Sequence, residues 1–346
     1  MAIYIQSAEQ ISIQQPLSDA WFDAPIIYDS VYVRAIEPNY KEYIAPNKAR
    51  RMGKILKRAI ITALVAAKKS GIAVPDAIIS GTGLGCIEST GIFLEAMLRN
   101  GEELLQPTQF MQSTHNTIGS LASIEMKCHG YNSTYTHKGV SFENALLDAY
   151  LQFTAGRIKT ALVGGYDEMT SNYQLLLSRI GYWRAHGENV TLKKGEEAFA
   201  GETSVSFMLS DEKTEKTICQ ISGIQLLYKP SEKDLQFALN ELLCPVDNID
   251  AVFVGVNGNK TNDDVYYRNA SILFAGKPLA GYKHIFGESY TASGLGMYAA
   301  ATCLRKQRIP QHLLLNGCKE INPVKTLLLY NQFEDKNHSL TLLTSC

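Results

Sequence analysis

Short apolar segments that have the character of buried strands alternate with helical segments through both halves of this chain. Strands are expected at residues 77–81, 159–165, 204–210, 217–228, 251–256, 326–333 and 338–344. Helices are expected at residues 57–71, 87–101, 117–130, 234–243 and 293–307, with Gly101 and Gly130 ending the second and third. Such alternation is typical of α/β layers. No proline- or serine-rich linker separates the halves, so they should fold as one body.

Composition limits the classes of function. The chain has 346 residues, 45% of them hydrophobic, and a formal net charge of −1, which suits a protein with a sizeable core and disfavours nucleic acid as a partner. Its seven cysteines form no CxxC pair and no tight cluster, so we expect neither a metal site nor a cofactor. The N-terminus lacks a signal-peptide pattern, and no run of about 18 apolar residues occurs. We therefore expect a cytoplasmic protein without a membrane span.

Five blocks of sequence resemble motifs of the β-ketoacyl synthases and follow the same order. They are GTGLGCIEST from Gly81, GYNSTYTHKGVSFENALLDA with ALVGG from Gly130 to Gly165, FAGETSVSFMLSD from Phe199, AVFVGVNGNKTNDD from Ala251 and KHIFGESYTASG from Lys283. The resemblance touches roughly residues 80–346. It implies the thiolase fold, an α/β fold of five layers in the order αβαβα. It also implies two pseudo-equivalent halves, residues 1–215 and 216–346, in one compact unit.

The resemblance implies that the family's three catalytic positions are degenerate. Counted without gaps from either end of its block, the position of the nucleophilic cysteine falls on Gly139. The two catalytic histidines look like Asn257 and Glu288. Glycine has no side chain to acylate, and an ionised carboxylate would repel an enolate. We therefore expect no condensation on this chain alone and no catalytic residue in it.

Other positions of the family pattern are kept. Lys283 keeps the frame before the second histidine position, and it could form an ion pair with Glu288. The closing segment LLYNQFEDKNHSLTLL resembles the family's final loop and keeps Phe333 and Asn337, together with Asn331. The gating glycine-phenylalanine pair of that loop is shortened to EDK. A loop that regulates acyl entry is therefore expected to be lost.

Within the family the chain is most similar to the divergent group of aryl-polyene and flexirubin-type pathways. The similarity lies in RRMGKILKRA from Arg50, PTQFMQSTHNTIGSLAS around His115, and SFENALLDA. Such subunits resemble the chain-length factors of type II polyketide systems. The resemblance implies a non-catalytic subunit in a heterodimer with an active ketosynthase, which elongates and limits a polyene, polyketide or fatty acyl chain held by phosphopantetheine on acyl carrier protein. The pairing strand is expected after the segment ending at Gly165, and the helix behind Gly139 is expected to line the tunnel wall.

Two alternatives stay open. One is a thioester decarboxylase or hydrolase that uses Glu288 and Asn257. The other is a homodimeric scaffold that binds carrier protein without a ketosynthase.

A basic stretch begins where the first long helix is expected, and it includes Arg50, Arg51, Lys54, Lys57 and Arg58. The spacing puts several of these charges on one helix face. Such a face is ordinarily solvated, but it would also suit docking of an acidic carrier protein.

Several polar residues have structural interpretations that compete with functional ones. We expect His115 and Asn116 to cap a helix or line the degenerate site, and Ser141 to cap the helix that starts near Glu143 rather than to supply a hydroxyl with Thr136. Cys128 and His129 are neighbours whose side chains should point apart, which argues against a nucleophile pair. Asp167 and Glu168 are expected to be loop or interface groups. Cys86 replaces the third glycine of a dinucleotide fingerprint, so nucleotide binding is not expected.

Overall fold

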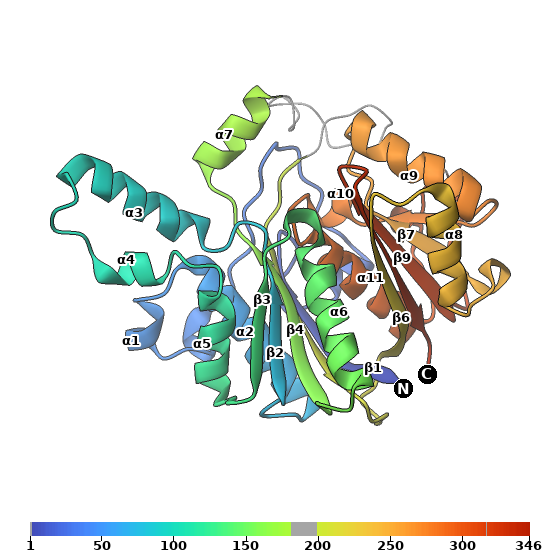
Figure 1. Ribbon diagram of the computed structural model, residues 1–346, viewed down its shortest axis with the longest axis horizontal. Coiled ribbons are helices and arrows are strands. Elements are labelled where there is room, and N and C mark those ends of the chain that lie inside the picture. Colours follow the sequence, from blue (N-terminus) through green and yellow to red (C-terminus); the bar gives the residue numbers. More distant parts are fainter. Residues whose placement is uncertain (1, 181–198, 316) are drawn as a thin grey trace.

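The computed structural model describes residues 2–180, 199–315 and 317–346, and in these ranges the protein consists of two equivalent halves (Figure 1). The first half has strands in the order β3-β2-β4-β5-β1, and the second has β8-β7-β9-β10-β6. In each half the first three strands run parallel and the fourth is antiparallel to the third. The strands are β1 (Ile3–Ile11), β2 (Ala77–Gly81), β3 (Tyr131–Tyr135), β4 (Thr160–Asp167), β5 (Thr203–Ser210), β6 (Cys219–Tyr228), β7 (Ala251–Val254), β8 (Leu279–Gly281), β9 (Thr326–Phe333) and β10 (Asn337–Thr344).

The two halves meet where β1 pairs with both β5 and β6. Residues 3–5 of β1 pair with Cys219–Ile221 of β6, and this short antiparallel ladder joins all ten strands into one sheet. The repeated strand order agrees with two pseudo-equivalent halves. Their boundary near residue 215 remains a prediction.

Two buried helices, α6 (Ser141–Thr154) and α11 (Ala292–Lys306), lie between the two halves of the sheet. Every residue of α11 from Ala292 to Leu304 is buried, as expected for a helix covered on all sides. A Cβ atom at Gly294 would lie only 2.7 Å from Val205 of β5. The glycine therefore lets the helix approach the strand closely.

Other helices cover the outer faces and complete the five layers (Figure 1). Helices α2 (Lys54–Ser70) and α5 (Thr117–Met126) pack on the first half, and α8 (Glu232–Glu241) and α9 (Lys260–Leu273) on the second. Helices α3 (Ile87–Asn100) and α4 (Pro107–Met111) form an arm that extends away from the body. Three further helices are α1 (Pro46–Ala49), α7 (Ser171–Arg179) and α10 (Lys283–Phe286).

Two sequence predictions need correction. The helix expected to end at Gly130 ends at Lys127, whose φ of 54° places it in the left-handed region; Gly130 instead precedes β3. The pairing strand was expected after Gly165, but that strand is β5, which is bonded on both sides by β4 and β1. Among the described residues no strand pairs with the outer edge of β3, so β3 is the strand of the first half with a free edge.

No helix in the described ranges combines the length and the apolar character that crossing a membrane would require.

Candidate functional site

Gly139 lies in the tight turn before α6, and its surroundings leave no room for a side chain. A Cβ atom at this position would lie 2.3 Å from Cδ2, 2.7 Å from Cγ and 3.0 Å from Cβ of Phe333. Carbon atoms in contact ordinarily lie about 3.5–4.0 Å apart. The ring of Phe333, at the end of β9, therefore occupies the space into which a side chain at position 139 would project.

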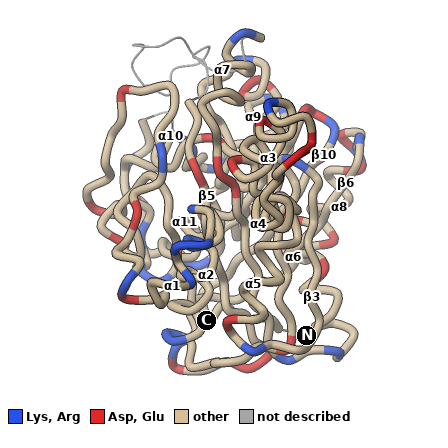
Figure 2. Tube along the Cα trace, turned by 90° about the vertical axis from the view of Figure 1, so that its left-hand side faces the viewer, with Lys and Arg blue, Asp and Glu red and all other residues tan. Residues whose placement is uncertain are grey.

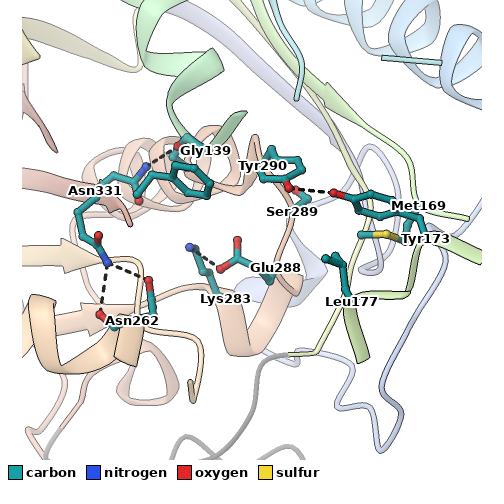
Figure 3. A pocket seen from close by; sticks show the side chains of 13 residues that line it. Gly139, Met169, Tyr173, Leu177, Asn262, Lys283, Glu288, Ser289, Tyr290 and Asn331 are labelled. Atoms are coloured by element: carbon teal, nitrogen blue, oxygen red, sulfur yellow. Dashed lines mark hydrogen bonds and ion pairs between the residues drawn. The ribbon is translucent and has the colours of Figure 1, made fainter. Parts of the chain in front are cut away.

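Lys283, the first residue of α10, and Glu288, which follows that helix, lie beside Gly139 (Figure 3). Asn257, in the turn after β7, contacts Glu288. Lys283 Nζ donates a hydrogen bond of 2.7 Å to Glu288 Oε2, and Asn257 Nδ2 donates one of 2.5 Å to the same oxygen. Both charged side chains are buried. The ion pair predicted from the sequence is confirmed.

The backbone around Glu288 is fixed by its neighbours. Gly287 has a φ of 76° and packs against the backbone of Gly201. A Cβ atom at position 287 would lie 2.7 Å from the Gly201 Cα. Glu288 N–H donates to the carbonyl of Phe199, and its own carbonyl accepts from Gly201 N–H. A glycine at both positions is thus needed to bring the carboxylate to Lys283.

Asn331 connects the turn at Gly139 to the second half of the chain. Its Nδ2 donates to the Gly139 carbonyl at 3.1 Å and to Glu143 Oε1 at 2.6 Å, and its Oδ1 accepts from Tyr266 at 2.7 Å. Burial raises the pKa of Glu143. The other Glu143 oxygen and the hydroxyl of Ser293 are buried without a hydrogen-bond partner among the described residues. From the sequence, Glu143 was expected only to mark the start of a helix.

These residues surround a small cavity with both polar and apolar lining (Figure 3). The lining includes the polar side chains of Lys283, Glu288 and Ser293 and the apolar side chains of Met169 and Leu177. Across the mouth, the hydroxyls of Tyr173 and Tyr290 are hydrogen-bonded at 2.9 Å. The cavity volume is about 40 Å³. That space holds roughly three water molecules, at about 10–15 Å³ each.

The family model described as Beta-ketoacyl synthase, N-terminal domain, matches residues 32–239, more than half of the chain. The chain belongs to the β-ketoacyl synthase family. No curated protein matches it by sequence.

Several solved structures resemble this ketosynthase-family chain over its whole length. The ishigamide ketosynthase/chain length factor has a TM-score of 0.83 at 15% identity, with 100% of this chain and 99% of that one covered. The ketosynthase ApeO in complex with its chain length factor ApeC, from Xenorhabdus doucetiae, gives 0.80 at 13%, covering 100% and 98%. AntDE:AntF, a type II polyketide synthase acyl-carrier protein in complex with its ketosynthase, gives 0.79 at 11%, covering 100% and 99%. These likenesses establish the α/β thiolase fold for this member of the family.

Asp167 and Glu168 bind loops rather than facing the cavity. Asp167 accepts hydrogen bonds from the N–H groups of Gly83 and Leu84, each at 2.9 Å, and from Thr291 at 2.8 Å. Burial raises the pKa of Asp167 to about 6, although these donors oppose the rise. Glu168 accepts from the N–H of Glu88 at the start of α3, and burial raises its pKa to about 7. Asp167 thus connects the end of β4 to the glycine-rich turn at Gly83, and Glu168 connects it to the start of α3.

The helix-start predictions are only partly right. Asn116 precedes α5, but its side chain makes no capping hydrogen bond, and exposed His115 packs over Gly85 outside the cavity. Ser141 is the first residue of α6; its hydroxyl donates to Lys138 O and accepts from His137 N–H. It therefore closes the preceding turn and does not cap a helix that begins at Glu143.

One residue of the predicted basic stretch, Arg58, does not reach the surface. Arg58 is buried and forms ion pairs of 2.7 Å with Glu37 and 2.9 Å with Glu202, so it is not available for docking. Lys57 is half-buried, with its ammonium 4.9 Å from the ring of Tyr40. The basic residues that reach the surface gather around α1 and the start of α2 (Figure 2): Arg50, Arg51, Lys54 and Lys57.

Within the described ranges no group of His, Cys, Asp and Glu side chains is arranged to hold a metal ion. Asn337, expected from the family pattern, pairs with Phe333 and Tyr228 in the sheet and does not line the cavity.

Proposed function

We propose that this chain is a non-catalytic ketosynthase-like subunit, a chain-length factor, that pairs with a catalytic ketosynthase to elongate a carrier-bound acyl chain. The observation that carries the proposal is the contact between Gly139 and Phe333. A condensing enzyme must hold its acyl chain on a nucleophile. Here the expected nucleophile position has no side chain, and an aromatic ring fills the space beside it.

The polar groups near Gly139 support the same proposal. Glu288 Oε2 already accepts two hydrogen bonds, from Lys283 and Asn257, so the three side chains satisfy one another. Stabilising an enolate would require donors directed into the site. A cavity of about 40 Å³ also has no space for an acyl chain. We infer that Gly139, Asn257 and Glu288 are vestigial catalytic positions.

The surface beside β3 supports a protein partner. The arm formed by α3, α4 and their connection exposes Leu98 at 84%, Leu104 at 93% and Met111 at 68%. Leu176 and Ile180, at the end of α7, are also exposed. Large exposed apolar side chains on a projecting arm, and a strand with a free edge, are each typical of protein–protein interfaces. Two of the similar structures are described as a ketosynthase with a chain length factor.

Contact with an acyl carrier protein is part of the proposal. Lys41, Arg50 and Lys57 line a surface groove of about 420 Å³ between the segment at Tyr40 and helix α1. A basic groove of this kind suits the acidic surface of a carrier protein. AntDE:AntF is described as a carrier protein bound to its ketosynthase. The product class, whether aryl polyene, flexirubin-type or another polyketide, is proposed on sequence resemblance alone.

The proposal is tested by co-expression with a ketosynthase from the same genome that has an intact Cys-His-His triad. We expect a 1:1 complex by size-exclusion mass analysis, and elongation of malonyl-carrier protein only by that complex. Replacing the partner's cysteine with alanine should abolish elongation. Replacing Glu288 with glutamine should leave the reaction step intact wherever the complex still forms.

The same experiment separates the alternatives. Decarboxylation or hydrolysis of a thioester by this chain alone, lost in the Glu288→Gln variant, would establish an altered enzyme. A stable homodimer that binds carrier protein but no ketosynthase would establish a scaffold. Either result would overturn the chain-length-factor proposal.

A further inference from the structure

The free edge of β3 is flanked by basic residues at both ends. Lys127 and His129 precede the strand, and His137 and Lys138 follow it; all four side chains are exposed. Residues 126–142 contain no Asp or Glu. Among the described residues none of these four side chains forms an ion pair.

Of three carboxylates that lie near β3 on neighbouring elements, one is ion-paired and two accept hydrogen bonds from neutral groups. Asp148 of α6 accepts from Gln152, and burial together with this carboxylate raises the pKa of Tyr135 at the end of β3. Asp76 accepts from the N–H groups at the start of β4, at 2.9 Å from Thr160 N. Glu125 of α5 is ion-paired with Lys48. Lys127 and Lys138 therefore lie exposed at the two ends of the edge strand without an ion-pair partner among the described residues.

Pairing two copies through β3 would bring the lysines at the strand ends of the two copies together. A two-fold axis makes the two edge strands antiparallel, so that the residues before one strand lie opposite the residues after the other. If Ser133 lies on the axis, His129 faces His137 of the second copy, and Lys127 lies close to the second copy's Lys138. The contact occurs twice, once on each side of the axis. Like charges placed opposite each other weaken an association strongly.

We propose that these basic residues select the partner: they disfavour pairing of two copies of this chain and favour a ketosynthase-fold subunit whose edge strand is flanked by Asp or Glu. The apolar arm supplies adhesion without distinguishing partners, whereas the charged strand ends determine which subunit can pair. This inference rests on the proposed function, because it assumes that β3 and the arm form the subunit interface. It adds the chemical character of the partner's strand and the reason for a heterodimer.

The test is charge reversal at one end of the strand. Lys138→Glu in both copies places a carboxylate opposite Lys127 and His129, and His129→Glu does the same from the other end. Each variant should tighten self-association about tenfold or more by sedimentation equilibrium and weaken the ketosynthase complex by a similar factor. Lys233→Glu on α8, on the other side of the body, makes the same change in net charge as Lys138→Glu and should alter neither constant.

Salt supplies a second readout that does not depend on any substitution. Raising salt from about 50 to 500 mM screens repulsion and attraction alike. Self-association of the unaltered chain should therefore strengthen while its complex with the ketosynthase weakens. A ketosynthase complex that forms but responds to neither Lys138→Glu nor salt would overturn this inference and leave the proposed function standing. Absence of any ketosynthase complex would overturn the proposed function, and the self-association arm would still show whether the charges oppose homodimers.

Discussion

Replacing Gly139 with alanine should destabilise the protein because Phe333 occupies the space of the new methyl group. The Cβ would lie 2.3 Å from Cδ2 and 3.0 Å from Cβ of Phe333. Since ordinary carbon contacts are about 3.5 Å or longer, the closest pair would be more than 1 Å too near. Rotation of the ring cannot relieve the whole overlap, because the β9 backbone fixes the Phe333 Cβ. Overpacking of this kind costs about 1–3 kcal/mol.

A double-mutant cycle in urea measures this contact. Gly139→Ala should lower the free energy of unfolding by about 1–3 kcal/mol in the unaltered protein, but by less than about 1 kcal/mol when Phe333 is alanine. Gly91→Ala is the matched control, because a Cβ at Gly91 in α3 meets nothing within 4 Å. That control should be neutral or stabilise by up to about 1 kcal/mol. Additive costs in the cycle, or a Gly139→Ala variant as stable as the control, would refute the account of a ring-filled site.

Three further predictions concern charge and surface. Glu288→Gln leaves the buried ammonium of Lys283 without its counterion and should cost about 3–5 kcal/mol in urea unfolding; a loss below 1 kcal/mol would mean that the ion pair is not buried as described. Burial raises the pKa of Glu168 from 4.5 to about 7, so the folded state binds the proton more tightly than the unfolded state, and this group's contribution should fall by about 3 kcal/mol as pH rises from about 4.5 to 7. Glu168→Gln should flatten that part of the pH profile of stability, and an unchanged slope would contradict the assignment. Leu104→Glu, at a side chain that is 93% exposed, should change stability by less than about 0.5 kcal/mol yet weaken the ketosynthase complex at least tenfold, as measured by calorimetry; unchanged affinity would remove the arm from the interface.

Much of the candidate site was predictable because glycine spacing is visible in sequence. Counting along motifs placed Gly139 at the head of a buried helix and brought Lys283 and Glu288 into one neighbourhood, and the structure puts them around one cavity. Counting could not predict that Phe333 fills the space beside Gly139. That contact joins two segments almost two hundred residues apart, and only the packing of β9 against the turn before α6 creates it.

Strands β1 and β3 and helix α9 were not predicted, because their many polar residues mask the apolar pattern that identifies a strand or helix. Strand β1 contains Gln6, Glu9 and Gln10, all buried, and Glu9 is satisfied by an ion pair with Lys69 of α2. Nothing local in IYIQSAEQI predicts that partner. Strand β3 contains Asn, Ser and Thr because one edge is free, so it lacks the apolar alternation of a central strand. Helix α9 begins with a run of polar residues behind the Asn259 cap, and no helix was expected there.

The position of β1 between β5 and β6 sets the order in which this chain can assemble during synthesis. The strand is synthesised well before its hydrogen-bonding neighbours, which lie about 200 residues later in the chain, at Thr203–Ser210 and Cys219–Tyr228. Contacts of such long sequence separation form slowly, and unpaired strand edges are prone to aggregate in the meantime. A nascent chain that stops before residue 203 would therefore hold an orphaned β1. Two separately expressed halves would leave β1 and β6 each with one unpaired edge over the stretch where they otherwise meet.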